Sequence, residues 1–310
     1  MKIVFLGTPE FGVQILNALT EEHEVVLVVT QPDKLVGRKQ VLEYSPVKKR
    51  ALELGIDVFQ PASIRLEYEY ITQNYEYDLI VSAAYGQIVG MKLLNSPRYR
   101  SINVHASLLP KGRGGAPIQR AIMNGDKETG ISIMYMEKGM DTGAILAQES
   151  LAIEDSDTKE TLFYKLGCLG AKMINPTIKA LTEGKIKPII QDEEKATYTY
   201  ALTKEDEILD FSRSAHLVSC QIRALGEIGA TFKIDGVNYK VYKASVIINN
   251  VSLPYKTITD VTKKYFDVAC GDNNVIRIEE IKPEGKNLMK VSDFLNGKGR
   301  NILIKGKCID

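Results

Sequence analysis

Asn103 and His105 stand two residues apart at the end of a short apolar run, and a glycine-rich loop with two basic residues follows them. If the run is a β-strand, residues two apart point to the same face, so an amide and an imidazole project side by side. An amide can donate a hydrogen bond to an oxygen that gains negative charge, and an imidazole can move a proton near neutral pH. The pair therefore predicts a site that stabilises an oxyanion and transfers a proton. The alternative is a structural histidine whose hydrogen bonds are satisfied at the end of a strand.

Asp141 offers a carboxylate from a different part of the chain. It follows a second apolar run and comes directly before a Thr-Gly turn. A carboxylate beside His105 would orient the imidazole and favour its protonated form, whereas an ordinary turn aspartate fits the same local sequence. No G-x-S-x-G motif is present, so a serine nucleophile is not indicated. The three side chains therefore suit direct attack of a substrate amine on an acyl carbon.

Strands that end at one edge of a sheet could bring these side chains together. Short apolar or β-branched runs predict strands, separated by helical or irregular stretches, at 2–7, 24–30, 78–84, 102–106 and 130–136. This alternation predicts an α/β fold with a Rossmann-like, mostly parallel sheet that helices cover on both faces. Open sheets of this kind bind ligands at the carboxyl ends of their strands, where Asn103 and His105 would lie.

The first strand and its turn argue against a nicotinamide cofactor. The turn at 7–12 reads G-T-P-E-F-G, with a proline where dinucleotide-binding turns need a glycine. Thr8 is instead predicted to cap a helix that has Pro9 at its first position.

The second part of the chain has a different pattern. A polar segment at 191–206 predicts a linker between a catalytic domain at 1–190 and a C-terminal domain at 207–310. In that domain, alternating or β-branched runs are interrupted by D-G, D-N-N and G-K-G turns, which predicts a small antiparallel, OB-like β-barrel. After residue 207 the chain has 16 basic and 11 acidic residues, a balance that fits a polyanionic partner or an ordinary solvated surface.

Composition is typical of an intracellular globular protein. The chain has 310 residues, a net charge of +1 and four widely spaced cysteines without a C-x-x-C motif, which indicates free thiols and no structural zinc. No apolar stretch is long enough to span a membrane, and the N-terminal run is too short for a signal peptide. We expect a cytoplasmic protein with no metal and no membrane contact, and nothing in the sequence requires more than a monomer.

Segments along the whole chain resemble those of the methionyl-tRNA formyltransferases, a branch of the folate-dependent formyltransferases. They include FLGTPEFG, TQPDKLVGR, VSAAYGQI, INVHASLLPKGRGGAPIQRAI, GDKETGISIMYMEKGMDTGAIL and ATYTYALTKED. The resemblance implies transfer of a formyl group from 10-formyltetrahydrofolate to the α-amino group of methionine on initiator tRNA, in translation initiation and through a tetrahedral intermediate. It assigns the catalytic roles to Asn103, His105 and Asp141.

The resemblance also implies two sets of binding residues. Folate would contact a turn and a pterin pocket formed by Ser107, Leu108, Leu109, Pro110, Tyr85, Gly86, Gln87 and Ile88. The tRNA acceptor arm would contact the C-terminal barrel and a basic insertion that contains Lys34, Arg38, Lys39 and Lys48. Two alternatives stay open: an amino-sugar-nucleotide N-formyltransferase, which needs the same core but has less use for the insertion, and a non-catalytic RNA-binding protein.

Overall fold

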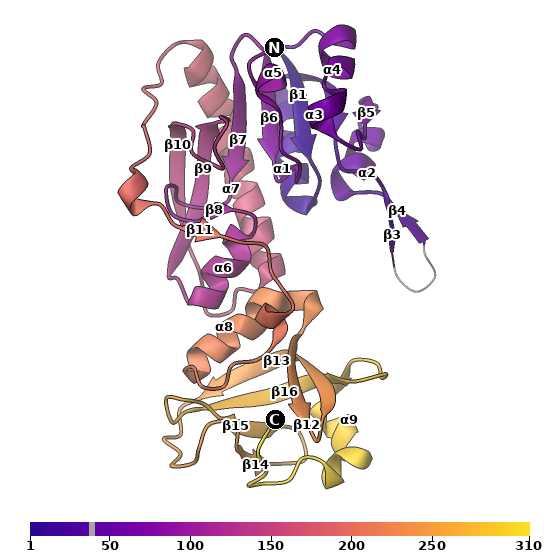
Figure 1. The fold of residues 1–310 in the computed structure, drawn as a ribbon, viewed down its shortest axis with the longest axis vertical. Helices are drawn as coiled ribbons and strands as arrows, with labels where there is room; N and C mark the ends of the chain where they lie inside the picture. Colours follow the sequence, from indigo (N-terminus) through magenta and orange to yellow (C-terminus); the bar gives the residue numbers. More distant parts are fainter. Residues whose placement is uncertain (37–40) are drawn as a thin grey trace. The chain divides into compact units, whose positions relative to one another are not determined.

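The computed structural model of the chain describes residues 1–36 and 41–310. Within these residues the chain forms two compact units, each built around its own sheet (Figure 1). The first unit consists of Met1–Pro117, Glu128–Ala152 and Thr161–Tyr200, and the second of Ile118–Lys127, Ile153–Glu160 and Ala201–Asp310. The residues predicted to do chemistry all lie in the first unit.

The first unit is built on a mixed sheet with the strand order β10-β9-β7-β6-β1-β2-β5. Its strands are β1 (Lys2–Gly7), β2 (Glu24–Val29), β5 (Val58–Phe59), β6 (Leu79–Ala83), β7 (Ser101–His105), β9 (Glu128–Tyr135) and β10 (Ile145–Ala152). Neighbouring strands from β7 through to β5 run parallel, while β9 is antiparallel to both β7 and β10. The predicted α/β fold with a mostly parallel sheet is confirmed.

The edge strand β10 was not among the predicted strands. From Ala147 on, its residues alternate between partly covered and exposed positions, because successive side chains point to opposite faces and one face is more exposed. A continuous apolar run identifies a central strand such as β1, in which Ile3, Val4, Phe5 and Leu6 are completely buried. An edge strand has no such run and is harder to recognise.

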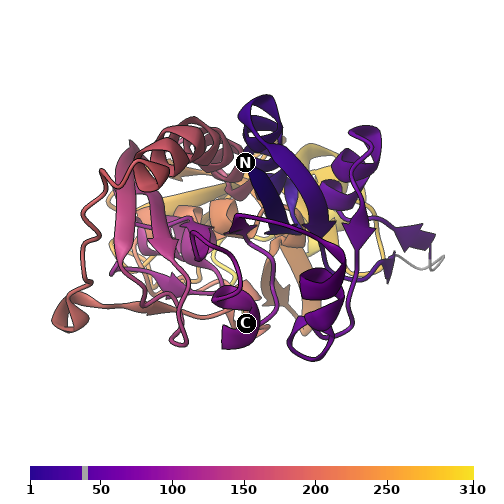
Figure 2. The ribbon, with the colours of Figure 1, turned by 90° about the horizontal axis from the view of Figure 1, so that it is seen from above.

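Helices cover both faces of this sheet, as Figure 2 shows from above. They are α1 (Glu10–Glu22), α2 (Pro46–Glu53), α3 (Ile64–Glu67), α4 (Glu69–Asn74), α5 (Met91–Leu94) and α7 (Lys159–Thr182). On one face, Val4 of β1 shares a buried cluster with Ile71 of α4 and Leu93 of α5. Elsewhere α7 packs on α1, where the Asn175 amide donates a hydrogen bond of 2.7 Å to the Ala18 carbonyl.

The predicted cap of the first helix is wrong. Helix α1 begins at Glu10, its N-cap residue is Pro9, and no side chain caps it. The Thr8 hydroxyl instead donates to the Tyr85 carbonyl at 2.9 Å. This bond ties the residue after β1 to the segment after β6, so Thr8 helps to shape the edge of the sheet where the site lies.

A short hairpin separates β2 from α2. It consists of β3 (Lys34–Val36) and β4 (Val41–Glu43), which pair antiparallel. Of the basic residues predicted in this insertion, Arg38 and Lys39 lie outside the described residues. After the hairpin, the Ser45 side chain accepts a hydrogen bond from the backbone N–H of Lys48 and caps α2.

The last part of the first unit, residues 189–199, is here called the strap. At its start, Ile189 forms a β-bridge with Ile145 of β10. At its end, β11 (Tyr198–Thr199) pairs in parallel with β8 (Arg113–Gly114) in the glycine-rich loop. Residues 191–199 of the predicted linker are thus paired with the first unit.

The second unit contains an antiparallel sheet with the order β12-β13-β16-β15-β14 and with β17 beside β16. Its elements are α6 (Pro117–Asn124, whose first residue belongs to the first unit), α8 (Ala215–Leu225), β12 (Ala230–Ile234), β13 (Val237–Ile247), β14 (Ile258–Val261), β15 (Phe266–Ala269), β16 (Val275–Pro283), β17 (Met289–Lys290) and α9 (Val291–Leu295). The predicted antiparallel character is confirmed. Among the described strands, β12 pairs with β13 alone and β14 with β15 alone.

Candidate active site

Strand β7 delivers Asn103 and His105 to the carboxyl edge of the sheet. Asn103 lies beside Ser82 of β6 and Met134 of β9, and His105 lies beside Ser132 of β9. His105 is buried and Asn103 is half-buried. In the part of the chain that the structure describes, the Asn103 amide has no protein hydrogen-bond partner. It is therefore available to a substrate.

The two ring nitrogens of His105 have different surroundings. Nε2 lies 2.9 Å from the Gly112 carbonyl oxygen, and because a carbonyl can only accept, Nε2 carries the proton of the neutral ring. Nδ1 lies 3.7 Å from Oδ2 of Asp141. This separation allows an ion pair with a protonated ring, but it is longer than a direct hydrogen bond. Nδ1 is consequently the nitrogen that can take a proton from a substrate.

Asp141 is held in a fixed position beside this ring. Its Oδ2 accepts a hydrogen bond of 2.8 Å from the backbone N–H of Gly114. Its backbone has a φ of +52°, a left-handed conformation that is uncommon for residues other than glycine. The structure thus brings together a histidine and an aspartate that are far apart in the sequence.

The turn that follows β7 is tied down by hydrogen bonds of its own. The Ser107 hydroxyl donates to the Lys111 carbonyl, and the Ser107 carbonyl accepts from the Ser132 hydroxyl, each at 2.7 Å. Leu109 is buried in a small cluster with Met134. Its backbone N–H donates to the Ser132 hydroxyl at 3.1 Å, and its carbonyl accepts from the Gln148 amide at 2.9 Å. Leu108 and Pro110 are half-buried.

The segment after β6 is anchored through Tyr85 and Gln87. The Tyr85 ring is buried, and its carbonyl accepts hydrogen bonds from Thr8 and from the Gln31 amide, the latter at 3.2 Å. The side-chain oxygen Oε1 of Gln87 accepts from the backbone N–H of Ile64 at 2.8 Å. The Tyr85 backbone and the Gln87 side chain thus hold the predicted pterin-pocket segment in shape.

Gly86 and Ile88 differ from their anchored neighbours. Within residues 1–36 and 41–310, no hydrogen bond involves their backbone N–H or carbonyl groups. Gly86 has a φ of +89°, which glycine adopts readily. The Ile88 side chain is 83% exposed. Free backbone groups next to an exposed apolar side chain fit a flat heteroaromatic ring.

The predicted tRNA-binding residues differ in their availability. Lys34 is exposed. Lys48 forms an ion pair with Asp33 in which both side chains are mostly covered, and its ammonium also lies 3.9 Å from the centre of the Tyr44 ring. Burial would raise the pKa of Asp33, but hydrogen bonds from Lys48 and Gln60 outweigh it and lower that pKa. Lys48 thus has a structural partner, which a phosphate would have to displace.

The structure also contains a His–Cys pair that the sequence reasoning overlooked. In the second unit, Nε2 of His216 lies 3.5 Å from Sγ of Cys220, one helical turn away on α8. Burial raises the pKa of the Cys220 thiol, which keeps it protonated at neutral pH. Because the thiolate is the nucleophile, this pair does not indicate covalent catalysis.

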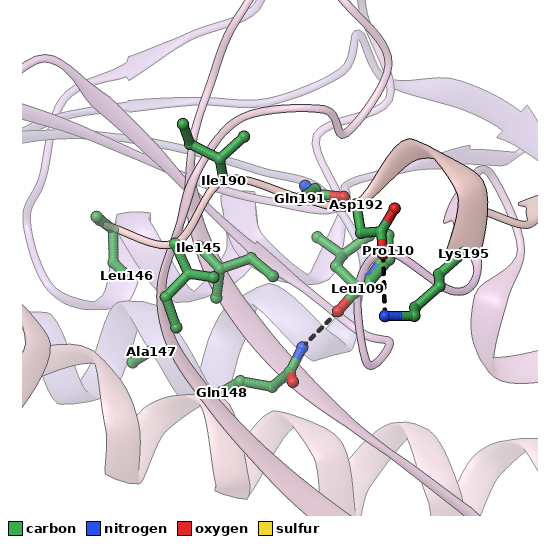
Figure 3. A pocket seen from close by; sticks show the side chains of 11 residues that line it. Leu109, Pro110, Ile145, Leu146, Ala147, Gln148, Ile190, Gln191, Asp192 and Lys195 are labelled. Atoms are coloured by element: carbon green, nitrogen blue, oxygen red, sulfur yellow. Dashed lines mark hydrogen bonds and ion pairs between the residues drawn. The ribbon is translucent and has the colours of Figure 1, made fainter. Parts of the chain in front are cut away.

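Arg113 and Gln191 were also missed as site residues. Both are buried, and Nε and Nη2 of Arg113 donate to Oε1 of Gln191 at 3.0 and 2.9 Å. The strap also borders a groove of about 380 Å³, in which Gln191, Asp192 and Lys195 face Leu109 and Pro110 (Figure 3). In the sequence, Arg113 is marked only by the three glycines beside it. No local pattern connects it with Gln191, which lies far along the chain.

Metal and membrane features are absent from the described part of the chain. No group of three or more histidine, cysteine, aspartate or glutamate side chains there could hold a metal ion. None of its helices has both the length and the apolar character needed to cross a membrane.

Two family models and several relatives match this chain. The model for formyl transferase matches residues 1–178, and the model for the formyl transferase C-terminal domain matches residues 201–299. The methionyl-tRNA formyltransferase of Pediococcus pentosaceus is 44% identical over 305 residues, which cover 97% of this chain and 95% of that protein. The methionyl-tRNA formyltransferase of Lactobacillus johnsonii is 42% identical over 311 residues, which cover 99% of each chain.

Solved structures share the fold at lower identity. An N-formyltransferase from Helicobacter canadensis, in complex with folinic acid and dTDP-3-aminofucose, has a TM-score of 0.68 and 21% identity, with 90% of this chain and 98% of that chain covered. HypX from Aquifex aeolicus, in complex with tetrahydrofolic acid, has a TM-score of 0.66 and 16% identity, with 95% of this chain and 47% of that chain covered.

Proposed function

The chain belongs to the methionyl-tRNA formyltransferase family, and we propose that it transfers a formyl group from 10-formyltetrahydrofolate to the α-amino group of methionine on initiator tRNA, for translation initiation. The amine attacks the formyl carbon directly, so a carbon–nitrogen bond to methionine forms and the bond to the folate nitrogen breaks. The observation that carries this proposal is the 3.7 Å approach of His105 to Asp141 at the edge of the sheet, with the unpaired amide of Asn103 on the same strand.

Each of the three side chains has a separate task. The Asn103 amide donates a hydrogen bond to the formyl oxygen, which gains negative charge as the amine attacks. Nδ1 of His105 takes the proton that the amine loses and delivers it to the folate nitrogen as the bond to that nitrogen breaks, while the Gly112 carbonyl holds Nε2. The carboxylate of Asp141 then stabilises the imidazolium by Coulomb attraction.

The segment after β6 and the turn after β7 are the proposed folate site. The bound folate supplies an activated formyl group. Free backbone groups at Gly86 and Ile88 would read the edge of the pterin ring, and the exposed Ile88 side chain would cover its face. The hydrogen bonds to the Tyr85 backbone carbonyl and those of the Gln87 and Ser107 side chains would keep these groups in place.

The tRNA is proposed to bind through its phosphates. Lys34, Arg38 and Lys39 in the insertion and the basic segment after residue 207 offer positive charge, and phosphate contacts of this kind supply most of the affinity for nucleic acid. Lys48 joins them only if the phosphate displaces Asp33. All the assigned side chains come from a single chain, so we propose that one copy is sufficient for activity.

A choice among acceptors tests the proposed function. Labelled formyl transfer from 10-formyltetrahydrofolate is measured with charged initiator tRNA, charged elongator methionine tRNA and an amino-sugar nucleotide. We expect efficient transfer to the initiator tRNA and little to the sugar nucleotide. Preference for the amino sugar would identify a sugar N-formyltransferase, and tRNA binding without transfer to any acceptor would identify a non-catalytic RNA-binding protein.

A further inference from the structure

We propose that Gln191 and Arg113 are positioning residues that hold Asp141 in place for its contact with His105, an inference that rests on the proposed function. Nε2 of Gln191 donates hydrogen bonds of 2.8 Å to the carbonyls of both Asp141 and Gly143. The side-chain amide of Gln191, on the strap, thus holds the backbone at two points of the loop that carries the Asp141 carboxylate.

Arg113 fixes the amide group of Gln191 in turn. Two of its nitrogens donate to Oε1 of Gln191, so the Gln191 amino group must face the Asp141 loop. Nη1 and Nη2 of Arg113 also donate to the two carboxylate oxygens of Glu193, each at 2.8 Å. The Arg113 side chain is completely buried. A buried, bidentate arginine is a rigid anchor because its fork of donors leaves it little freedom.

The strap also holds the loop that contacts the other nitrogen of His105. The backbone N–H of Arg113 donates to the Thr197 carbonyl, and the backbone N–H of Gly112 donates to the Thr197 hydroxyl, each at 2.9 Å. The Gly112 carbonyl is the group that binds Nε2 of His105. The strap therefore stabilises the partners of both ring nitrogens without touching the ring itself.

Stabilisation of Asp141 is needed because its conformation is unfavourable. Its left-handed backbone costs free energy in a residue with a side chain, and such a conformation persists only when surrounding contacts hold it. The contacts that hold it are the Gly114 N–H on its carboxylate and the Gln191 amide on its carbonyl. Without the Gln191 bonds, we expect the carboxylate to move away from His105.

The substitution Gln191→Glu separates positioning from a purely structural role. A glutamate still accepts both hydrogen bonds from Arg113, but it cannot donate to the two carbonyls. If Gln191 served only to pair Arg113, this variant would keep wild-type turnover. If it positions Asp141, kcat should fall about tenfold to a hundredfold with little change in KM for tRNA or folate, since small displacements of a reacting group have effects of this size. Glu194→Ala is the matched control, because its side chain is exposed on the same strap and does not border the groove.

Amide hydrogen exchange at Gly114 gives a second measurement that does not depend on activity. The Gly114 N–H is bonded to the Asp141 carboxylate, so its exchange should be faster in Gln191→Glu and unchanged in Glu194→Ala. Wild-type kcat together with unchanged exchange in Gln191→Glu would overturn the proposal. If Gln191→Glu does not fold, Gln191→Met is compared with Glu193→Gln in both measurements. Glu193→Gln weakens the pairing of Arg113 but leaves the Gln191 bonds to the Asp141 and Gly143 carbonyls in place, so equal effects in the two variants would overturn the proposal. If the wild-type protein transfers no formyl group, the proposed function fails, while the exchange data still test the positioning.

Discussion

At the scale of single residues, the chemistry depends on the charge of Asp141 as well as on its position. The carboxylate does two things: it accepts from the Gly114 N–H and it faces Nδ1 of His105 at 3.7 Å. Only the second task needs a negative charge. A negative charge at this distance attracts the imidazolium that forms when Nδ1 takes a proton.

The substitution Asp141→Asn tests this electrostatic role. The asparagine oxygen can still accept from the Gly114 N–H, so the loop should stay in place while the charge is lost. We expect kcat to fall about tenfold or more, with an unchanged midpoint of thermal unfolding. Glu194→Gln is the control, since it removes an exposed carboxylate from the strap. Turnover of the Asp141 variant equal to that of this control would refute the role of the charge.

At the scale of elements, the pairing of β8 with β11 decides whether the glycine-rich loop is ordered. Gly114 has a φ of +113°, and a Cβ atom there would lie 2.2 Å from the Thr199 carbonyl oxygen. A side chain at this position is therefore incompatible with the observed strand pair. The strap would have to move away, and Gly112, which holds His105, would lose its support.

Gly114→Ala should accordingly disrupt the strap. The matched control is Gly184→Ala, where the backbone also has a positive φ, +66°, but no heavy atom lies within 4 Å of the new Cβ. The control should cost about 1 kcal/mol for the left-handed backbone alone. The overpacked variant should lose about 1–3 kcal/mol more, together with most of its turnover. Equal losses of unfolding free energy in the two variants would show that the strand pair tolerates the clash.

Some elements could be predicted from the sequence and others could not. Continuous apolar runs identified β1, β2, β6, β7 and β9, because strands buried on both faces leave that pattern. The edge strand β10 and the strap leave no such pattern. The order of the strap depends on a buried arginine about eighty residues earlier, a relation that no local period can reveal. Thr8 was assigned to the wrong partner because a hydroxyl near a helix start can also bond across the sheet.

Part of the candidate site could be predicted from the sequence for similar reasons. Asn103 and His105 share a strand, so their common face follows from a period of two. Asp141 was placed in a loop near them, but its left-handed backbone and its distance from Nδ1 depend on contacts between distant segments. Among the predicted tRNA residues, Lys34 is exposed and Lys48 has a mostly covered ion-pair partner, while Arg38 and Lys39 lie outside the described residues.

At the scale of the whole molecule, tRNA is proposed to bind through electrostatic contacts with its phosphates. Each phosphate contact contributes roughly 0.9 to the slope of affinity against salt on a double-logarithmic plot. The double substitution Arg38→Ala with Lys39→Ala should reduce this slope for kcat/KM with tRNA by about 2. The charge-matched control is Lys172→Ala with Lys185→Ala, two exposed lysines outside the insertion. An identical slope in the two double variants would exclude the insertion as a phosphate-binding element.

The most direct test of the central claim is single-turnover formylation of charged initiator tRNA by the wild-type protein, Asn103→Ala and His105→Ala, with saturating 10-formyltetrahydrofolate. Removal of one oxyanion donor typically lowers the rate of the chemical step about a hundredfold, and we expect at least that loss in the asparagine variant and a loss of similar size in the histidine variant. Both variants should still bind 5-formyltetrahydrofolate and unfold at the wild-type temperature. Near-wild-type rates in both would contradict the assignment of formyl transfer to this edge of the sheet.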